Sequence, residues 1–181
     1  MAGIETTGPV ADDAAGLSLS DPFAVGLLRF LPEPIRQPRL AWRSIVFGWA
    51  TAFVGSIILS ALAAWGAPDL ARPDFPIGGA MLVFLLVIFS PFVETLIMAG
   101  GIELLRQFLK PTLVVIASAL LWGIAHSSAA LAWGLVIWWP FLIFSTLYLA
   151  WLPRGKMRAI GIVFATHALQ NLPVALVLLQ R

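Results

Sequence analysis

Four polar side chains lie in the most apolar stretches of this 181-residue chain. Glu94, His126 and His167 stand in three separate apolar runs, and Asn171 follows His167 by four residues. A glutamate paired with a histidine can hold and deprotonate a water molecule. A second histidine and an asparagine can donate hydrogen bonds to a developing oxyanion. Together, these four side chains are the parts needed to hydrolyse an amide bond.

The apolar surroundings favour a functional role for these residues. A charged side chain costs on the order of 3 kcal/mol or more at the centre of a bilayer, and ionisable residues inside membrane segments mark functional sites by default. Each residue also has a structural interpretation. A lone histidine can bond a neighbouring carbonyl, Glu94 can be a packed, protonated acid, and Asn171 can join two helices. The coincidence of all four favours one shared polar site.

The composition indicates a polytopic membrane protein with membrane lipid as its surroundings. Hydrophobic residues make up 60% of the chain and charged residues only 11%, which leaves too little polar surface for a soluble domain of this size. The chain has no cysteine, which excludes disulfides, thiolate metal sites and a cysteine nucleophile. The formal net charge of +2 is too small to indicate a nucleic-acid partner.

Five apolar segments are predicted to cross the membrane as helices, because lipid forces the backbone polar groups to be satisfied internally. They cover about 44–65, 78–105, 112–127, 130–152 and 159–179. The predicted fold is therefore all-α, a bundle of about five transmembrane helices within 42–181. Residues 1–41 form a separate N-terminal tail, in which 17–31 predicts either an amphipathic helix on the membrane surface or a loose segment.

Basic residues predict the orientation of the bundle. They concentrate before the first span, between the second and third, and between the fourth and fifth, whereas the other loops hold only Arg72. The positive-inside rule then predicts a multi-pass protein with its N-terminus in the cytoplasm and its C-terminus outside. Arg72 and the terminal Arg181 are the exceptions to this bias.

Helix geometry allows the four polar side chains to meet. Counted from the cytoplasmic end of each span at ~1.5 Å per residue, Glu94 lies ~16 Å deep, His126 ~21 Å and His167 ~13 Å. Asn171 shares the helix face of His167, one turn deeper. Because the span ends are defined only to within several residues, these depths overlap and permit a single site in the middle of the membrane.

Other hydrolytic chemistries fit the sequence less well. The chain has no His-Glu-x-x-His zinc motif, no aspartate in any predicted span and no Gly-x-Ser-Gly sequence around a serine nucleophile. We therefore expect a water mechanism without a cofactor. Zinc held by Glu94, His126 and His167 is the lower-ranked alternative.

The first span also contains a stripe of small residues. They recur at four-residue spacing, at Gly48, Ala52, Ser56, Ser60 and Ala64. Small residues on one face let another helix approach closely. We interpret the stripe as a packing face within the chain, with a homodimer contact as the alternative.

Three segments resemble the motifs of a known family. They read Ser90-Pro-Phe-Val-Glu94-Thr95-Leu-Ile-Met-Ala99, Trp122-Gly-Ile-Ala-His126 and His167-Ala-Leu-Gln-Asn171. In order and spacing they are similar to the Glu-Glu-x-x-x-Arg, Phe-x-x-x-His and His-x-x-x-Asn motifs of the CAAX-protease and bacteriocin-processing family of intramembrane endopeptidases. The resemblance covers roughly 78–175.

The resemblance implies a glutamate-dependent peptidase embedded in the membrane. In that family the first Glu and the His of the second motif activate water, which assigns these roles to Glu94 and His126. The His and Asn of the third motif stabilise the oxyanion, which assigns that role to His167 and Asn171. Some descriptions of the family call its members metalloproteases, so the resemblance leaves zinc open.

The sequence departs from the family pattern at three positions. The second Glu of the first motif is Thr95, its Arg is Ala99, and the Phe of the second motif is Trp122. Thr95 and Trp122 are therefore candidate supporting residues. Glu103 and Arg106 do not occupy motif positions, and we expect them at the membrane interface. The missing Glu–Arg pair indicates a divergent or catalytically weak member.

The leading hypothesis is a glutamic-type intramembrane endopeptidase of a bacterial inner membrane, which cleaves a membrane-presented peptide or protein. A non-catalytic binding or immunity protein on the same fold is the second hypothesis. A small proton-coupled transporter is the third, which the lack of internal repeats and the odd number of spans disfavour.

Overall fold

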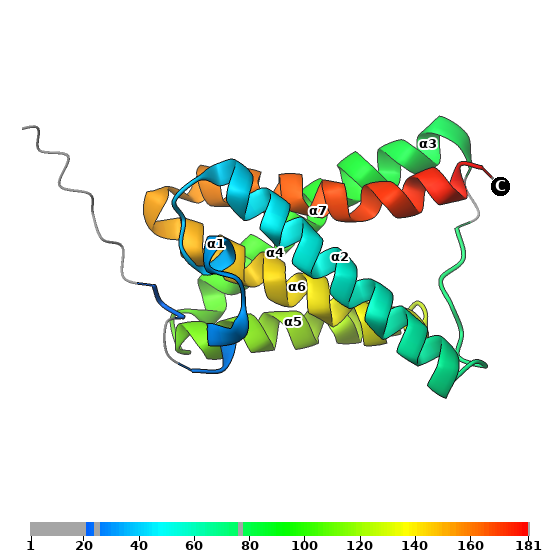
Figure 1. Cartoon of the computed structure of the whole chain (residues 1–181), viewed down its shortest axis with the longest axis horizontal. Helices are drawn as coiled ribbons and strands as arrows, with labels where there is room; N and C mark the ends of the chain where they lie inside the picture. Colours follow the sequence, from blue (N-terminus) through cyan, green and yellow to red (C-terminus); the bar gives the residue numbers. More distant parts are fainter. Residues whose placement is uncertain (1–20, 24–25, 76–77, 181) are drawn as a thin grey trace, which may run out of the picture.

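The computed structural model describes residues 21–23, 26–75 and 78–180, and the regular structure in these ranges is helical throughout. It confirms the predicted all-helical bundle (Figure 1). Four helical segments are long and apolar enough to cross a membrane, and a fifth, α5, is apolar but shorter. The chain is therefore a polytopic membrane protein.

The long helices follow the five predicted spans, with ends that shift by no more than three residues. They are α2 (Ala41–Gly66), a continuous segment made of α3 (Gly79–Phe84), a π-helical turn (Leu85–Phe89) and α4 (Ser90–Leu105), then α5 (Pro111–Ser127), α6 (Leu131–Trp151) and α7 (Lys156–Leu178). Gly155 makes the tight turn between α6 and α7 with a φ of 114°, a conformation that glycine adopts without the clash of a Cβ.

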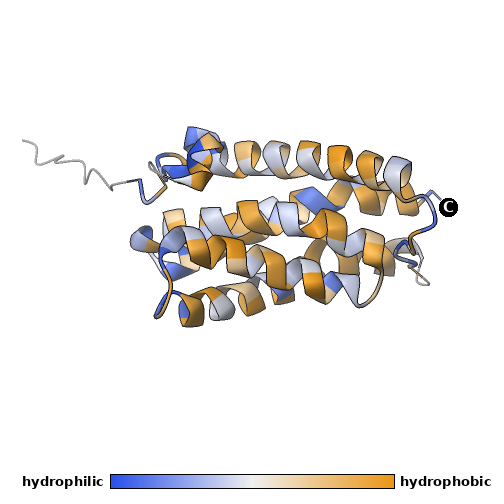
Figure 2. Cartoon of the chain, turned by 90° about the horizontal axis from the view of Figure 1, so that it is seen from below, coloured by the Kyte–Doolittle hydropathy of each residue, from blue (hydrophilic) through white to orange (hydrophobic). Residues whose placement is uncertain are grey.

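Helix α6 is the centre of the bundle and packs against α2, α5 and α7 (Figure 1). Within its most apolar window 67% of the residues are buried, compared with 11% for α2. Large hydrophobic side chains on the outer helices remain exposed, among them Ile57, Leu62 and Phe84. Figure 2 shows hydrophobic residues, in orange, along the length of the helices. This exposed apolar surface is what a lipid environment stabilises.

The small residues of α2 have two kinds of neighbour. Gly48 approaches α6 so closely that an added Cβ would lie 2.8 Å from Leu147, and Ala52 is fully buried. Ser56 and Ser60 line a cavity instead. The first half of the stripe is thus a packing face within the chain, and a homodimer contact stays a prediction.

The described part of the N-terminal tail packs against one end of the bundle. It consists of a 3-10 turn (Leu27–Phe30) and the short helix α1 (Glu33–Arg36). Four of its side chains join the hydrophobic core, namely Phe23, Leu28, Leu31 and Ile35. An ion pair between Arg36 and Asp21 fastens the segment. The stretch 17–31, for which the sequence left a surface helix and a loose segment open, lies partly outside the described residues, and the helical part that is described is the 3-10 turn.

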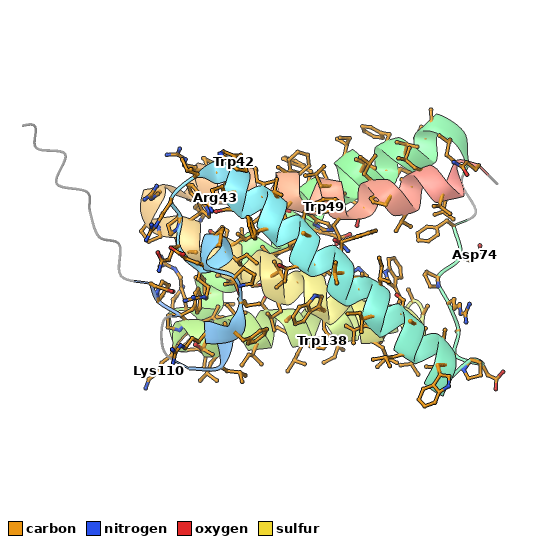
Figure 3. The ribbon with its side chains drawn as sticks, in the orientation of Figure 1. Trp42, Arg43, Trp49, Asp74, Lys110 and Trp138 are labelled. Atoms are coloured by element: carbon orange, nitrogen blue, oxygen red, sulfur yellow. The ribbon has the colours of Figure 1, made fainter. Side chains whose placement is uncertain are left out.

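Basic residues gather at the same end of the bundle, which we call the basic end. It includes the turn between α4 and α5 and the turn between α6 and α7, where Arg154 Nη1 donates to the carbonyl of Arg39 at 3.4 Å. Figure 3 places Arg43 and Lys110 at this end and Asp74 at the opposite one. We call the opposite end, formed by the loop between α2 and α3 and by the turn between α5 and α6, the far end.

Candidate active site

A cavity of about 390 Å³ lies between α2, α4, α5, α6 and α7. All four polar residues singled out in the sequence, Glu94, His126, His167 and Asn171, line it. Most of the remaining wall is apolar or small, and the loop between α2 and α3 adds Arg72 at its edge. The fold therefore brings these four side chains, from three helices, into one cavity.

The carboxylate of Glu94 is the centre of this arrangement. Its Oε2 lies 3.9 Å from Nε2 of His126 and 3.8 Å from Nε2 of His167. Its Oε1 accepts a hydrogen bond from the Ser90 hydroxyl, one turn earlier in the chain. Both imidazole distances are longer than a direct hydrogen bond, and one water can bond both atoms of either pair. The Glu94 side chain is 20% exposed, so the cavity gives access to it.

A backbone carbonyl fixes the tautomer of His126. Its Nδ1 lies 2.9 Å from the carbonyl oxygen of Trp122. Because a carbonyl oxygen only accepts hydrogen bonds, Nδ1 must hold the hydrogen and donate it. In the neutral ring, Nε2 then presents a lone pair toward Glu94. His126 is therefore a hydrogen-bond acceptor on the cavity side.

His167 presents the opposite polarity. Its ring is only 4% exposed and lies against the rings of Phe141 and Phe144, with centroids 5.4 and 4.7 Å away. Its Nδ1 has no hydrogen-bond partner among the described residues. A buried N–H without an acceptor costs about 1–3 kcal/mol, so the neutral ring keeps its hydrogen on Nε2, where Glu94 can attract it. His167 is therefore a donor on the cavity side.

Asn171 makes a backbone contact from the cavity wall. Its Nδ2 donates to the carbonyl oxygen of Leu86 at 2.9 Å, which connects α7 to the π-helical turn before α4. One of the two N–H groups of Asn171 is thus committed to the protein itself. The role of oxyanion donor that the family resemblance assigned to Asn171 stays a prediction.

The two candidate supporting residues have different surroundings. Thr95 is 1% exposed, and its hydroxyl has no hydrogen-bond partner in the described part of the chain. Ala99, one turn further, is 2% exposed and belongs to the hydrophobic core. Trp122 supports His126 through its backbone carbonyl, while its ring stacks on Phe141 at 4.2 Å. The positions of the missing Glu–Arg pair are therefore both buried.

The sequence did not indicate several polar residues of the cavity as site residues, and Ser90 and Gln170 are the two described ones whose side chains donate hydrogen bonds there to other helix residues. Ser90 precedes Glu94 by four residues, and residues at this spacing share a helix face, so the spacing was a usable signal. Gln170 lines the cavity and donates from Nε2 to the Ser56 hydroxyl at 3.2 Å. That bond joins α7 to α2, and no local pattern in the sequence indicates it.

Glu103 and Arg106 lie near the basic end of α4, close to where the sequence placed them. Glu103 accepts hydrogen bonds from Arg106 Nε and from the Tyr148 hydroxyl, each at 2.8 Å. Neither Glu103 nor Arg106 is among the described residues that line the cavity. This second acidic site is structural.

The zinc alternative requires three converging ligands. Among the residues that the structure describes, no group of three or more His, Cys, Asp or Glu side chains is arranged to hold a metal ion. Zinc bound by Glu94, His126 and His167 has no preformed ligand set there and stays the lower-ranked alternative.

Comparisons with protein-family models, with curated proteins and with solved structures find no match for this chain. The resemblance to the CAAX-protease and bacteriocin-processing family therefore rests on the motif residues alone. The function has to be argued from the chemistry of the cavity.

Proposed function

We propose that this protein is an intramembrane endopeptidase of glutamic type. One observation supports the proposal above all: Oε2 of Glu94 faces Nε2 of His126 at 3.9 Å and Nε2 of His167 at 3.8 Å in one cavity. The three groups are a base, an acceptor and a donor. This is the set that water-mediated cleavage of an amide requires.

In the proposed reaction, a water bonds Glu94 Oε2 and the Nε2 lone pair of His126. Glu94 takes one proton as the water oxygen attacks the scissile carbonyl carbon. The Nε2–H of His167 donates to the resulting oxyanion. When the C–N bond breaks, Glu94 returns the proton to the leaving nitrogen, and the products are a carboxylic acid and an amine. Asn171 lines the same wall, but its Nδ2 already donates to the Leu86 carbonyl, so His167 is the oxyanion donor.

The cavity supports a peptide as the substrate class. Its volume of about 390 Å³ falls within the roughly 300–1,000 Å³ of ligand pockets, enough for a few residues of extended chain. Its wall is mainly apolar, and Ser90, His126 and His167 surround the Glu94 carboxylate. We infer a membrane-presented peptide or protein segment as the substrate, with no nucleic acid and no cofactor involved.

Divergence in the first motif is compatible with this activity because Ser90 supports the carboxylate. The family pattern supplies a second Glu and an Arg, whose positions here are the buried Thr95 and Ala99. The Ser90 hydroxyl instead donates to Oε1 of Glu94. Oε1 is thereby held, and Oε2 is left facing the imidazoles.

We also infer the placement of the protein in its membrane. The basic end holds the cationic turns, and the positive-inside rule puts such turns in the cytoplasm. The N-terminus would then be cytoplasmic and the C-terminus outside, in a multi-pass protein of the bacterial inner membrane.

Cleavage of a quenched fluorescent peptide library by the purified protein in liposomes tests the proposal. Glu94→Gln keeps the shape and removes the base, so we expect cleavage to fall by about 10²–10⁴-fold. Glu103→Gln on the same helix is the matched control and should cleave at the wild-type rate. Cleavage by Glu94→Gln at the wild-type rate would show that the mechanism is wrong. A wild-type protein that binds peptides without cleaving them would support the non-catalytic alternative.

A further inference from the structure

The π-helical turn at Leu85–Phe89 changes the backbone pattern directly before Glu94. The N–H of Ser90 donates to the carbonyl of Leu85, five residues back instead of four. The next donor in this pattern would be the N–H of residue 91, which is a proline and has none. The carbonyl of Leu86 is therefore left without a backbone donor.

Asn171 supplies the missing donor from another helix. Its Nδ2 lies 2.9 Å from the Leu86 carbonyl oxygen. In a membrane, a backbone carbonyl freed by proline must find a partner in a neighbouring helix, a side chain or an ordered water. Pro91 and Asn171 thus form a matched pair: one residue removes a donor, and the other replaces it.

The register of this turn decides where Glu94 points. One extra residue in a helical turn rotates all following residues by about 100° relative to an uninterrupted α-helix. Ser90 and Glu94 both follow the turn. If the turn relaxed to regular α-helix, the carboxylate would rotate away from His126 and His167. Turns of this kind occur frequently at functional sites.

We propose that Asn171 is a positioning residue that caps the Leu86 carbonyl, locks the π-helical turn and thereby aims Glu94 at the two imidazoles. This role deepens the proposed peptidase function and rests on it. The oxyanion is then stabilised by His167 alone, and Asn171 acts on the reaction only through the backbone of the Glu94 helix.

A double-mutant cycle between Pro91 and Asn171 tests this role. Asn171→Ala orphans the Leu86 carbonyl, and we expect kcat to fall on the order of tenfold with KM little changed. In the Pro91→Ala background, the N–H of residue 91 can bond Leu86, so the same substitution should reduce kcat far less. Pro111→Ala is the control background. Pro111 is the first residue of α5, where its missing N–H is not needed, so the tenfold loss should persist there.

Rescue by Pro91→Ala supports the positioning role, whereas an undiminished loss in that background would overturn it and make Asn171 a direct donor to the substrate.

The melting temperature in detergent adds a readout that needs no activity. Asn171→Ala should lower it more with Pro91 present than with Ala at that position. If neither the wild type nor any variant cleaves a peptide but the two backgrounds differ in melting temperature as expected, the peptidase proposal is wrong and the capping of Leu86 by Asn171 is supported. If Asn171→Ala lowers the melting temperature equally in both backgrounds while the wild type cleaves peptide, the capping role of Asn171 is wrong and the peptidase proposal is unaffected.

Discussion

Glu94 and Glu103 stand on the same helix, ~14 Å apart along its axis at ~1.5 Å per residue, and their surroundings differ completely. Both oxygens of Glu103 are engaged, Oε1 by the Tyr148 hydroxyl and Oε2 by Arg106. Among the described residues, Glu94 accepts a hydrogen bond only at Oε1, from the Ser90 hydroxyl. Its Oε2 faces a cavity and two imidazoles beyond direct hydrogen-bond distance.

The difference distinguishes a structural carboxylate from one that is available for reaction. A carboxylate whose two oxygens both accept hydrogen bonds from protein donors joins two helices, and fewer of its lone pairs remain for a substrate. A carboxylate with one oxygen held and one open toward a cavity is oriented but still available. The exposed fraction of the side chain does not distinguish the two residues, since it is 20% for Glu94 and 23% for Glu103.

Removing the acceptor beside Glu94 should produce the largest effect. In His126→Ala, the water loses the lone pair that orients it toward the base, so we expect cleavage to fall by about 10²–10⁴-fold. Peptide cleavage in liposomes measures the loss. Wild-type rates in this variant would mean that Glu94 acts without the imidazole and that the open oxygen is not paired with it.

Removing the donor should produce a somewhat smaller effect. In His167→Ala the oxyanion loses its principal hydrogen bond, which corresponds to a loss of about 10²–10³-fold in kcat. Steady-state kinetics with one peptide separate kcat from KM. A change confined to KM would show that His167 binds the substrate equally before and during the reaction, contrary to the proposed mechanism.

The Glu103 site should respond in stability and not in cleavage. Tyr148→Phe removes one of the two bonds to that carboxylate, worth roughly 1.5–3 kcal/mol for a bond to a charged group, with water offsetting part of it because Glu103 is not fully buried. The free energy of unfolding in mixed micelles measures this cost. The peptide cleavage rate should be unchanged. A large fall in that rate without a loss of stability would show that Glu103 is not purely structural.

The smallest effect is expected at Ser90. Ser90→Ala removes the bond that holds Oε1 of Glu94, worth about 1 kcal/mol, and kcat/KM should fall by roughly fivefold. Ser90→Thr keeps the hydroxyl and should restore most of the rate. Equal rates for the alanine and threonine variants, both far below the wild type, would indicate a packing role for this position.

The sequence predicted the bundle because membrane burial leaves few alternatives. An apolar run of about 20 residues can satisfy its backbone only as a helix, so the span ends came within a few residues of the observed ones. The predicted depths of Glu94, His126 and His167 permitted one shared site, and the three side chains line one cavity. The four-residue spacing from Ser90 to Glu94 also indicates a shared helix face, although Ser90 was not among the predicted site residues.

The remaining features depend on contacts that no local pattern contains. The π-helical turn at Leu85–Phe89 has an ordinary apolar sequence, and its register depends on a donor from α7. The bond between Gln170 and Ser56 joins helices more than a hundred residues apart in the chain. The apolar residues of the tail predicted either a surface helix or a loose segment. In the structure Leu28 and Leu31 are buried because they pack into the hydrophobic core of the bundle.

The shortness of α5 has a consequence for how water reaches the site. Its 17 residues span about 26 Å, less than the roughly 30 Å of a typical hydrocarbon core. A bilayer accommodates such a helix by thinning around it or by snorkelling of its flanking residues. His126 stands on the last turn of α5, next to the far end. Where the bilayer thins at that end, the barrier between bulk solvent and Glu94 is lowest on the side of the membrane nearest the proposed water-binding imidazole.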